Sequence, residues 1–509
     1  MYHLLLMAKT PASFDLSLPA RQAKTKPFQW LYEELRSAVL DGRLKPGSRL
    51  PSTRDLSNRY GVARGTVVTV FEQLRAEGYL EGKVGAGTYV SRRLPEDLLQ
   101  AKSSPIPAAV AESRPRLLSQ FAQRLPPSPR GTIPRIRAFR IATPAVDSFP
   151  LKLWADIATR RMRKATRSLL TDDDPAGYRP LREAIADYLG AARAVRCTAE
   201  QVIILAGIQQ ALDVTARLLL DPGDAVCAED PCFPGVTTMF RAMGARVIPV
   251  PVDEGGMNVR RGRRLCPKSR LIYVTPAHQF PLGMTMVAAR RIELLNWARG
   301  CKAIIFEDDY DSEYRYSGRP VAALQGLDRD GCVIIAGSFG KLLFPSLRLG
   351  YVVVPPGFVE KFLAARFTTD RHSAILDQAI LFDFIAEGHF ARHIRRMREL
   401  YASRMGVLRD CLRSKIGGAV HLPEIEVGVH TPAWLAAPLS AIDISKAAAE
   451  KDVEALPLSV FASQGNALNG LLLGFGAVDE RELRRGVDVL AGIIDKRPHR
   501  HLTNDSHPF

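Results

Sequence analysis

Hydrophobic residues near the start of the chain recur at helical spacing in three short segments, about residues 28–40, 52–60 and 63–77. Gly42 and Gly61 follow the first two segments, at a position where a glycine commonly ends a helix. The second segment begins with Ser52-Thr-Arg-Asp55, which has the form of a capping box. From Tyr79 to Val90 the apolar period changes to two around a glycine-rich tip, which predicts a β-hairpin.

A helix, a helix–turn–helix and a hairpin in this order predict a winged helix, whose third helix enters the major groove of DNA through its N-terminal residues. We expect DNA contacts from the start of that helix, from the flanks of the second helix and from the hairpin tip. These residues are, in the same order, Arg64 and Thr66, Arg49 and Arg54, and Lys83 and Gly85. A small helical protein-interaction module is the alternative interpretation of this spacing.

After about Ile141 the pattern changes to short apolar runs that alternate with amphipathic helical segments. The runs that fit strands are 202–205, 225–228, 246–250, 271–275, 303–307, 333–336 and 349–354. Alternation of this kind predicts an α/β fold with a mainly parallel sheet that is covered by helices on both faces. From about Asp383 the pattern is helical and then mixed, which indicates a small C-terminal α+β domain.

These changes in pattern divide the chain into folded parts and connecting segments. We expect an arm at 1–26, the winged helix at 27–92, a linker at 93–140, the large domain at 141–382, the small domain at 383–496 and a polar tail at 497–509. Residues 91–140 carry 10 Lys and Arg against 3 Asp and Glu, contain many prolines and show poor periodicity. Such a composition is typical of a flexible linker.

Positive charge is concentrated toward the N-terminus. The chain of 509 residues has a formal net charge of +17. Residues 1–140 hold 23 Lys and Arg against 11 Asp and Glu, whereas the rest of the chain holds 47 against 42. This asymmetry favours a polyanion, such as double-stranded DNA, as the partner of the N-terminal part.

The composition argues against several other classes of protein. No apolar run reaches the roughly 18 residues of a membrane span, and the first residues lack the features of a secretory signal. None of the seven cysteines forms Cys-x-x-Cys, so we expect reduced, mostly buried thiols and no metal site. We therefore expect a cytoplasmic protein without a membrane partner.

Four stretches fall at the ends of predicted strands, where open α/β sheets bind ligands. They are Gly207-Ile208-Gln209 at a helix N-terminus, Phe233, Glu307–Asp311, and Ser338-Phe-Gly-Lys341 with Arg348. Each stretch alone has an ordinary explanation. A glycine before a helix is common, an aromatic residue fits a core, acidic residues often cap the next helix, and a loop lysine usually reaches solvent.

Together these stretches suit pyridoxal 5′-phosphate (PLP). This cofactor needs an amine, a carboxylate for its ring nitrogen, an aromatic neighbour, and cations and amides for its phosphate. The matching groups, in the same order, are Lys341, Asp308, Phe233, and Arg348 with Ser338 and the amides of Gly207, Ile208 and Gln209. Tyr310 can donate to the ring oxygen. A serine acyl-enzyme built on Ser338-x-x-Lys341 is the weaker interpretation, because the companion motifs Ser-Asp-Asn and Lys-Thr-Gly do not occur.

The N-terminal motifs closely resemble the GntR-family DNA-binding domain over about Pro27–Val90. The segments that carry this resemblance are Pro46–Ser57, Tyr60–Val67, Ala76–Glu81 and Gly85–Val90. The resemblance implies DNA binding by a winged helix-turn-helix. Ala63 departs from the family, which commonly has Ser or Thr there, so we expect a helix cap or a phosphate contact to be lost.

Residues 141–494 resemble the fold-type I aminotransferases, and their fusion to a GntR-type head resembles the MocR/GabR-type transcription regulators. The motifs that carry this resemblance are Tyr178–Arg182, Thr275–Gly283, Glu307–Arg315, Ser338–Gly350 and Leu472–Gly476. The resemblance implies PLP as cofactor. It also implies a head-to-tail homodimer in which each DNA-binding domain packs on the large domain of the partner.

The resemblance assigns a role to each candidate cofactor residue. By it, Lys341 forms the Schiff base, Asp308 pairs with the pyridine nitrogen, Ser338 and Arg348 hold the phosphate, and His278 or Gln279 lies near the ring oxygen. Gly340, Ile208 and Leu282 depart from the usual residues of the family motifs.

A further departure concerns the substrate. Aminotransferases usually place an arginine near Leu472 to clamp the substrate carboxylate, and here the stretch reads Gly470-Leu-Leu-Leu-Gly474. We therefore expect a PLP-dependent transcription regulator without physiological turnover. It would sense PLP, or an amine or amino acid effector, through an aldimine at Lys341. The alternative is an active aminotransferase with an attached DNA-binding head.

Overall fold

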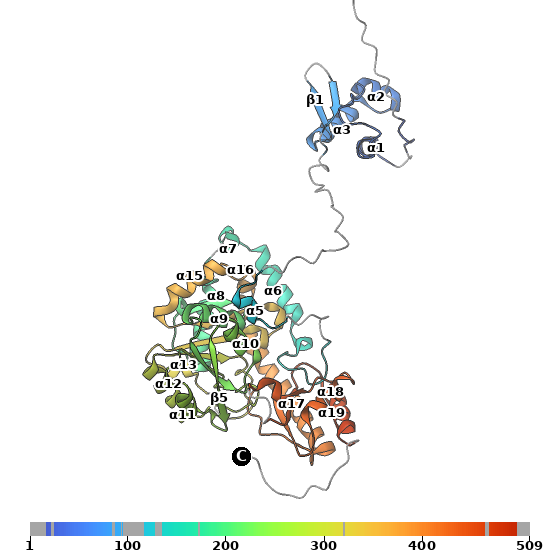
Figure 1. The fold of residues 1–509 in the computed structure, drawn as a ribbon. Coiled ribbons are helices and arrows are strands. Elements are labelled where there is room, and N and C mark those ends of the chain that lie inside the picture. The colour runs from blue at the N-terminus through green and yellow to red at the C-terminus, as the bar shows by residue number, and fades with distance from the viewer. Residues whose placement is uncertain are drawn as a thin grey trace, which may run out of the picture. The chain divides into compact units, whose positions relative to one another are not determined.

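The computed structural model describes residues 17–21, 25–83, 87–92, 94, 117–127, 135–171, 174–318, 321–463 and 468–495. The chain forms two units, residues 1–116 and residues 117–509 (Figure 1). Within the described residues no helix is both long and apolar enough to cross a membrane.

The first unit is a winged helix. Its elements are α1 (Pro27–Leu40), α2 (Thr53–Tyr60), α3 (Arg64–Ala76), and the antiparallel hairpin of β1 (Leu80–Lys83) and β2 (Gly87–Val90). Ser52 and Asp55 form the expected capping box at the start of α2, and Gly61 ends that helix with φ of 64°. Ala63 gives α3 no side-chain cap, as the sequence predicts. The three helices and the hairpin share one cluster of buried apolar side chains, which includes Leu31 of α1.

The second unit is built on an eight-stranded sheet. The strands lie in the order β3 (Val202–Leu205), β10 (Gly350–Val353), β9 (Val333–Ser338), β8 (Ile304–Asp309), β7 (Leu271–Val274), β4 (Ala225–Asp230), β5 (Arg246–Asp253) and β6 (Gly256–Met257). The five strands from β9 to β5 are parallel, whereas β10 runs antiparallel to both of its neighbours. The predicted mainly parallel sheet is confirmed.

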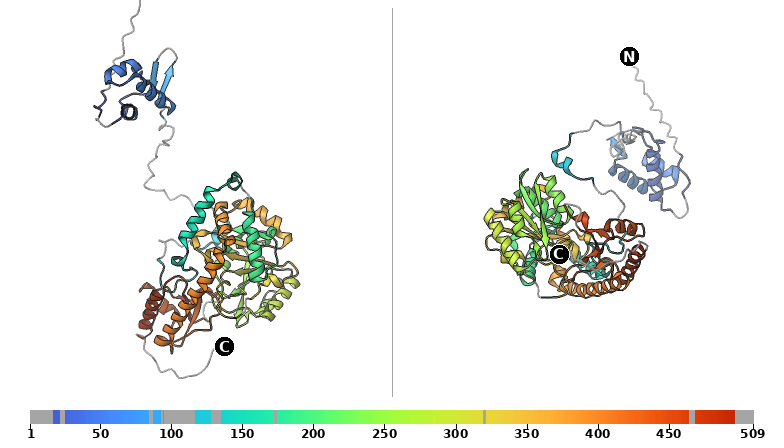
Figure 2. Two further views of the ribbon diagram at one scale, coloured as in Figure 1. Left: turned by 180° about the vertical axis from the view of Figure 1, so that it is seen from behind. Right: turned by 60° about the horizontal axis from the view of Figure 1, so that its bottom comes forward.

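Helices cover both faces of this sheet (Figures 1 and 2). One face packs against α9 (Ile208–Leu219), α10 (Pro234–Ala242) and α15 (Val359–Thr369). The other face packs against α8 (Arg179–Arg193), α11 (Val259–Leu265), α12 (Ala288–Cys301) and α16 (Ile375–Ala386). Side chains alternate between the faces along each strand, so Ile203 and Leu205 join the first cluster and Val202 and Ile204 the second.

A second, four-stranded sheet is formed by residues near the C-terminus. Its strands lie in the order β11 (Val420–His421), β12 (His430–Leu435), β14 (Gly470–Gly474) and β13 (Leu456–Pro457). The helices beside it are α17 (His389–Ile416), α18 (Ala441–Ala449) and α19 (Glu480–Ile494). The other helices of the second unit are α6 (Leu151–Arg163) and the short α5 (Gln120–Arg124), α7 (Arg167–Thr171), α13 (Leu324–Leu327) and α14 (Phe339–Leu342).

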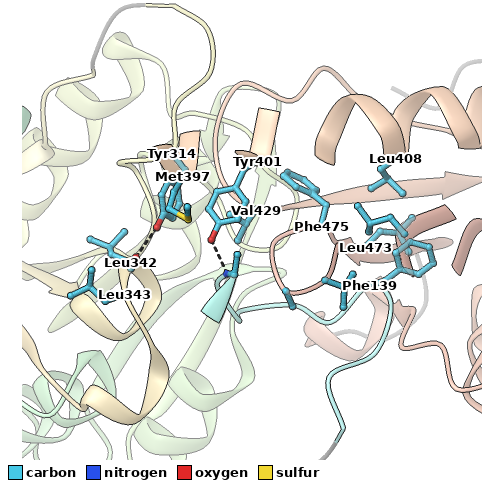
Figure 3. Close-up of a cluster of buried hydrophobic side chains, with 14 of the residues drawn as sticks. Phe139, Tyr314, Leu342, Leu343, Met397, Tyr401, Leu408, Val429, Leu473 and Phe475 are labelled. Atoms are coloured by element: carbon cyan, nitrogen blue, oxygen red, sulfur yellow. Dashed lines mark hydrogen bonds between the residues drawn. The ribbon is translucent and has the colours of Figure 1, made fainter. Parts of the chain in front are cut away.

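One hydrophobic core joins the two sheets of the second unit. Figure 3 shows Leu342 and Leu343, at the end of α14 (Phe339–Leu342), in the same cluster as Leu473 of the small sheet and Phe475 just after it. The helix α16 runs without a break through residues 382 and 383, where the sequence places the boundary between large and small domains. The small α+β part therefore packs as a continuation of the large part.

The structure differs from the sequence analysis at the end of the predicted linker. Ala138 and Phe139 have no exposed surface, and Phe139 forms a β-bridge with Gly474 of the small sheet. These residues are the start of the packed core, and Phe139 supplies one of its largest buried side chains. The local composition is basic and proline-containing, so it gives no sign of burial that only distant residues provide.

Candidate functional site

A cavity of about 290 Å³ lies in the second unit where β8 and β9 end. The predicted cofactor residues that line it are Gly207, Ile208, Gln209, Phe233, Asp308, Tyr310, Ser338, Lys341 and Arg348, whereas His278 and Gln279 do not. These residues come from loops that are far apart in the chain. The parallel order of the strands brings them together, because parallel strands end at the same edge of a sheet.

The alternation of side chains along β8 selects which carboxylate faces the cavity. Asp308 lies on the cavity side, whereas Glu307 and Asp309 point to the opposite face. Glu307 accepts hydrogen bonds from the backbone N–H groups of Leu324 and Gln325, and Asp309 pairs with Arg193 at 2.8 Å. The two flanking carboxylates are therefore structural, and Asp308 is the one available to a ligand.

Asp308 is buried and only half satisfied. Its Oδ2 accepts a 2.7 Å hydrogen bond from the Tyr273 hydroxyl, and its Oδ1 has no partner among the described residues. Burial raises the pKa of Asp308 to about 7, while the Tyr273 bond acts in the opposite direction. An unpartnered buried carboxylate oxygen is unfavourable, so this site favours a ligand that brings a cation or an N–H donor.

Lys341 lies on the short helix α14 that follows β9. Its Nζ donates a 3.0 Å hydrogen bond to the carbonyl of Ala142, a residue with a positive φ of 58°. Burial lowers the pKa of Lys341, although the carboxylates of Asp308 and Asp311 oppose that shift. A lowered pKa increases the fraction of neutral amine, which is the nucleophilic form.

The residue after Lys341 is held in place on two sides. The carbonyl of Leu342 accepts a 3.0 Å hydrogen bond from the Tyr314 hydroxyl, as Figure 3 shows, and its oxygen lies 3.1 Å from His393 Nε2. Burial lowers the pKa of His393 to about 4, so its ring is neutral and can donate from that nitrogen. The base of the lysine is therefore fixed, while its amine faces the cavity.

A third part of the cavity is rich in hydrogen-bond donors. Ser338 ends β9, Arg348 is exposed, and Gly207 caps the N-terminus of α9 with φ of 132°. The first N–H groups of a helix have no partner within it, so they are free to bind an anion. A Cβ atom at Gly350 would lie 2.9 Å from the Cα of Gly207, and this close approach requires a glycine.

Arg348 has an unusual backbone. Its φ of 50° and ψ of 40° lie in the left-handed region, which is costly for a residue with a side chain. Such strain persists only when the surrounding structure fixes it, and it is concentrated at functional sites. The conformation is consistent with an arginine that is placed for a ligand.

An aromatic side chain borders the same cavity. Phe233 precedes α10 and remains 45% exposed, which is high for a phenylalanine. Its ring meets that of Phe280 edge to face, with 6.0 Å between their centroids. The exposed ring face is available to an aromatic ligand.

His278 lies behind the cavity wall. Its Nδ1 is 2.8 Å from Asp311 Oδ1 and 3.0 Å from the Tyr310 hydroxyl oxygen. With Asp311 ionised, Nδ1 carries the proton and donates it to the carboxylate. The hydroxyl hydrogen of Tyr310 is then free to point into the cavity, so the predicted role near a ring oxygen fits Tyr310 better than His278.

His278, Asp311 and His430 bring buried ligand-type atoms within 4.8 Å of one another in the described part of the chain. The two imidazole rings are stacked, with 4.7 Å between centroids and 30° between planes. Stacked rings direct their nitrogen lone pairs nearly parallel, whereas the ligands of one ion must converge on it. The group is therefore better explained as a hydrogen-bonded cluster than as a metal centre.

Tyr273 and His430 line the cavity although the sequence does not predict them there, and Asp311 lines it as the last residue of the predicted stretch Glu307–Asp311. A tyrosine in the otherwise aliphatic run Leu-Ile-Tyr-Val was a usable signal, whereas His430 comes from the small sheet and has no local signal. Gln279 is the other residue predicted near the ring oxygen, but its side-chain amide donates to the carbonyls of Pro231 and Phe280 inside the protein.

In the first unit, the predicted DNA-binding residues lie before and on α2, at the start of α3 and at the end of β1. Arg64 is its first residue, Arg64, Arg49 and Arg54 are exposed, and Thr66 is partly buried. Lys83 is the last residue of β1. Gly85 lies outside the described residues.

Comparison with known proteins identifies both units. The model of the bacterial regulatory proteins of the gntR family matches residues 28–90, and the model of the class I and II aminotransferases matches residues 147–434. The chain is 40% identical over 471 residues to the probable rhizopine catabolism regulatory protein MocR of Rhizobium meliloti, a match that covers 92% of this chain and 94% of MocR.

Two further similarities agree with this result. The pyridoxine biosynthesis transcriptional regulator PdxR of Corynebacterium glutamicum is 31% identical over 95% of this chain and 98% of its own. A solved kynurenine aminotransferase of Pyrococcus horikoshii is 29% identical, with a TM-score of 0.66 over 71% of this chain and 91% of that one. The chain therefore belongs to the GntR-type transcription regulators of the MocR type, in which a DNA-binding winged helix is joined to an aminotransferase-like domain.

Proposed function

We propose that this regulator binds PLP in the cavity of its second unit and that the occupied cavity sets how the first unit binds DNA. The observation that carries the proposal is the convergence of a lysine amine, a half-satisfied buried carboxylate, an exposed phenyl ring and a cluster of anion donors on one cavity. PLP presents a matching group for each of them.

The described residues fit the cofactor on chemical grounds. Asp308 offers its free Oδ1 to a protonated ring nitrogen, and a cation there would compensate the buried negative charge. Lys341 would hold the aldehyde carbon through its amine. Ser338, Arg348 and the N-terminus of α9 would hold the phosphate. When bound, PLP supplies a carbonyl group that reacts with amines.

Known relatives support this assignment. The kynurenine aminotransferase was solved with PMP, the amine form of the same cofactor, and PdxR is named for pyridoxine biosynthesis. The regulator would act in the cytoplasm. An amino compound at the same site would bias DNA binding by its different affinity for the two states of the protein.

Slow or absent turnover is part of the proposal. The similarity to class I and II aminotransferases and the retained Lys341 favour an active transaminase as the second candidate. A steady-state assay with amine donors and a keto-acid acceptor separates the two. Sustained turnover that survives deletion of residues 1–100 would contradict a purely regulatory role.

The DNA contacts and the assembly also belong to the proposal. Arg64 and Thr66 would read the major groove, while Arg49, Arg54, Lys83 and Gly85 would contact the backbone or the minor groove. The active form would be a head-to-tail homodimer. Light scattering of the full chain should give the mass of two copies, and a strictly monomeric protein at the concentration that binds DNA would contradict this assembly.

The visible absorption spectrum of the purified protein with added PLP tests the cofactor directly. Wild type should show an absorption band that borohydride abolishes, and the reduced pyridoxyl group should then be found on the peptide that contains Lys341. After the same treatment, Lys341→Ala should carry no covalently attached pyridoxyl group at this site. If wild type and variant behave alike, the cofactor claim is wrong.

A further inference from the structure

One wall of the cavity is backed by an apolar cluster. Ile141 and Phe280 line it, and both belong to a cluster with Leu458, Phe461 and Leu472. Leu472 lies in the middle of β14 and has no exposed surface.

The cavity has few cationic groups, and each is assigned to the cofactor or paired with a carboxylate. Among its described lining residues only Lys341 and Arg348 carry a positive charge. The proposed function uses the first for the aldehyde and the second for the phosphate. Arg140, which precedes Ile141, pairs with Glu454 at 2.8 Å. None of these groups is left to neutralise a second anion on a ligand.

The remaining charge at the cavity is negative. Asp311 is buried, lines the cavity, and its Oδ2 has no partner among the described residues. His430 beside it is kept neutral, because burial and the neighbouring His278 and Lys341 lower its pKa well below the usual range. A ligand carboxylate here would be desolvated against an apolar wall and repelled by Asp311. An amine or a hydroxyl group would be favoured by the same residues.

We infer that the effector of this site is a primary amine without a carboxylate, and that the apolar cluster at Leu472 excludes α-amino acids. The inference rests on the proposed function, because it takes the cofactor to occupy Lys341 and Arg348. It goes further by naming the chemical class that the rest of the cavity accepts.

Matched pairs of ligands test the inference. Phenethylamine differs from phenylalanine, and isoamylamine from leucine, only by the carboxylate. Calorimetric titration of each into the full-length protein saturated with PLP should give an affinity at least about tenfold higher for the amine of each pair. An amino acid that binds as tightly as its amine would overturn the inference, and so would a cofactor-loaded protein that binds neither member of either pair.

A substitution at Leu472 sharpens the test. Leu472→Arg adds a cation to the apolar cluster and should move the amine-to-amino-acid affinity ratio toward the amino acid by about tenfold or more. Leu472→Met, which is neutral and of similar size, should leave the ratio unchanged. An unchanged ratio in a folded Leu472→Arg protein would contradict the role of this cluster, and the wild-type pairs decide the question if that variant does not fold.

The two failures are distinguishable. Without a borohydride-sensitive absorption band, the proposed cofactor site fails. With the band present and the amino acids preferred, only the inferred ligand class fails.

Discussion

The two units of the chain present their candidate functional residues in opposite ways. In the winged helix, Arg49, Arg54 and Arg64 are exposed to solvent. Exposed arginines can attract DNA phosphates without a preformed cavity, and salt screens this attraction. In the second unit, Asp308 is buried with one unpartnered oxygen and a raised pKa. The exposed arginines lower the stability of the free protein little. The unpartnered oxygen of buried Asp308 lowers the stability of the second unit until a ligand binds. Occupation of the cavity should therefore remove an unfavourable feature of the free second unit, in addition to the stabilisation that any bound ligand gives.

The largest effect expected from this difference is stabilisation of the second unit by the cofactor. A ligand at 100 times its Kd stabilises the unit that binds it by about 3 kcal/mol. Added PLP should raise the unfolding midpoint of the second unit and leave that of the winged helix unchanged, as followed by calorimetry. Lys341→Ala should lose most of the gain, and Lys268→Ala, at an exposed lysine of the same unit, should keep it. Equal stabilisation of both units would remove the contrast.

The next effect is a pH dependence. A carboxyl whose folded pKa is raised from 3.8 to about 7 contributes stability below pH 4 that is lost as the pH rises to about 7. Between pH 5.5 and 8 the PLP-free protein should lose about 2 kcal/mol through Asp308. Glu229, whose pKa burial also raises to about 7, adds to the same trend.

The control for this pH effect is a comparison of variants by urea unfolding. Asp308→Asn should remove the contribution of Asp308, so its stability should fall less than that of wild type over this range. Glu254→Gln, at an exposed carboxyl, should follow wild type. Identical pH profiles of Asp308→Asn and wild type would show that Asp308 is not the strained group.

In the winged helix a single arginine should act on affinity without acting on stability. Arg64→Ala should weaken binding to the protein's own promoter region about tenfold, which is about 1.4 kcal/mol. Gel-shift titration at fixed salt measures the loss, and thermal unfolding should show no change. Arg43→Ala, in the loop after α1, is the matched control. Unchanged binding of Arg64→Ala would move recognition away from α3.

The smallest effect concerns the helix cap. Ala63 precedes α3 in an extended conformation without a side-chain hydrogen bond. Ala63→Ser should stabilise the winged helix by about 1 kcal/mol, because the hydroxyl can accept from a free N–H group of the first turn. Ala63→Gly tests the backbone alone. A serine variant no more stable than wild type would show that α3 already starts without an unsatisfied group.

Much of the fold could be predicted from the sequence, since its signals are local. Periodicity located the three helices and the hairpin, and β3 covers the residues that its apolar run predicts. The lining of the cavity followed from one further rule, that ligands bind where parallel strands end. Lys341, Asp308 and Arg348 come from segments after or at the end of predicted strands and do line one cavity.

The remaining features depend on contacts between residues far apart in the chain. Ala142 accepts the bond from Lys341, and His430 reaches the cavity from the small sheet, although neither has a local pattern that distinguishes it. The basic neighbours of Phe139 predict a linker, whereas its side chain is buried in the core. The sequence predicts His278 beside the cofactor, and its imidazole bonds to Asp311 behind the wall. Tertiary packing alone determines these positions.

The coupling of the two units is the central claim, and DNA binding with and without the cofactor tests it most directly. Fluorescence anisotropy of a labelled promoter fragment, titrated with full-length protein, gives the apparent Kd in the absence and presence of saturating PLP. We expect PLP to change this Kd severalfold in wild type and to leave it unchanged in Lys341→Ala. A wild-type Kd that does not respond to bound PLP or to an amine added with it would contradict the claim.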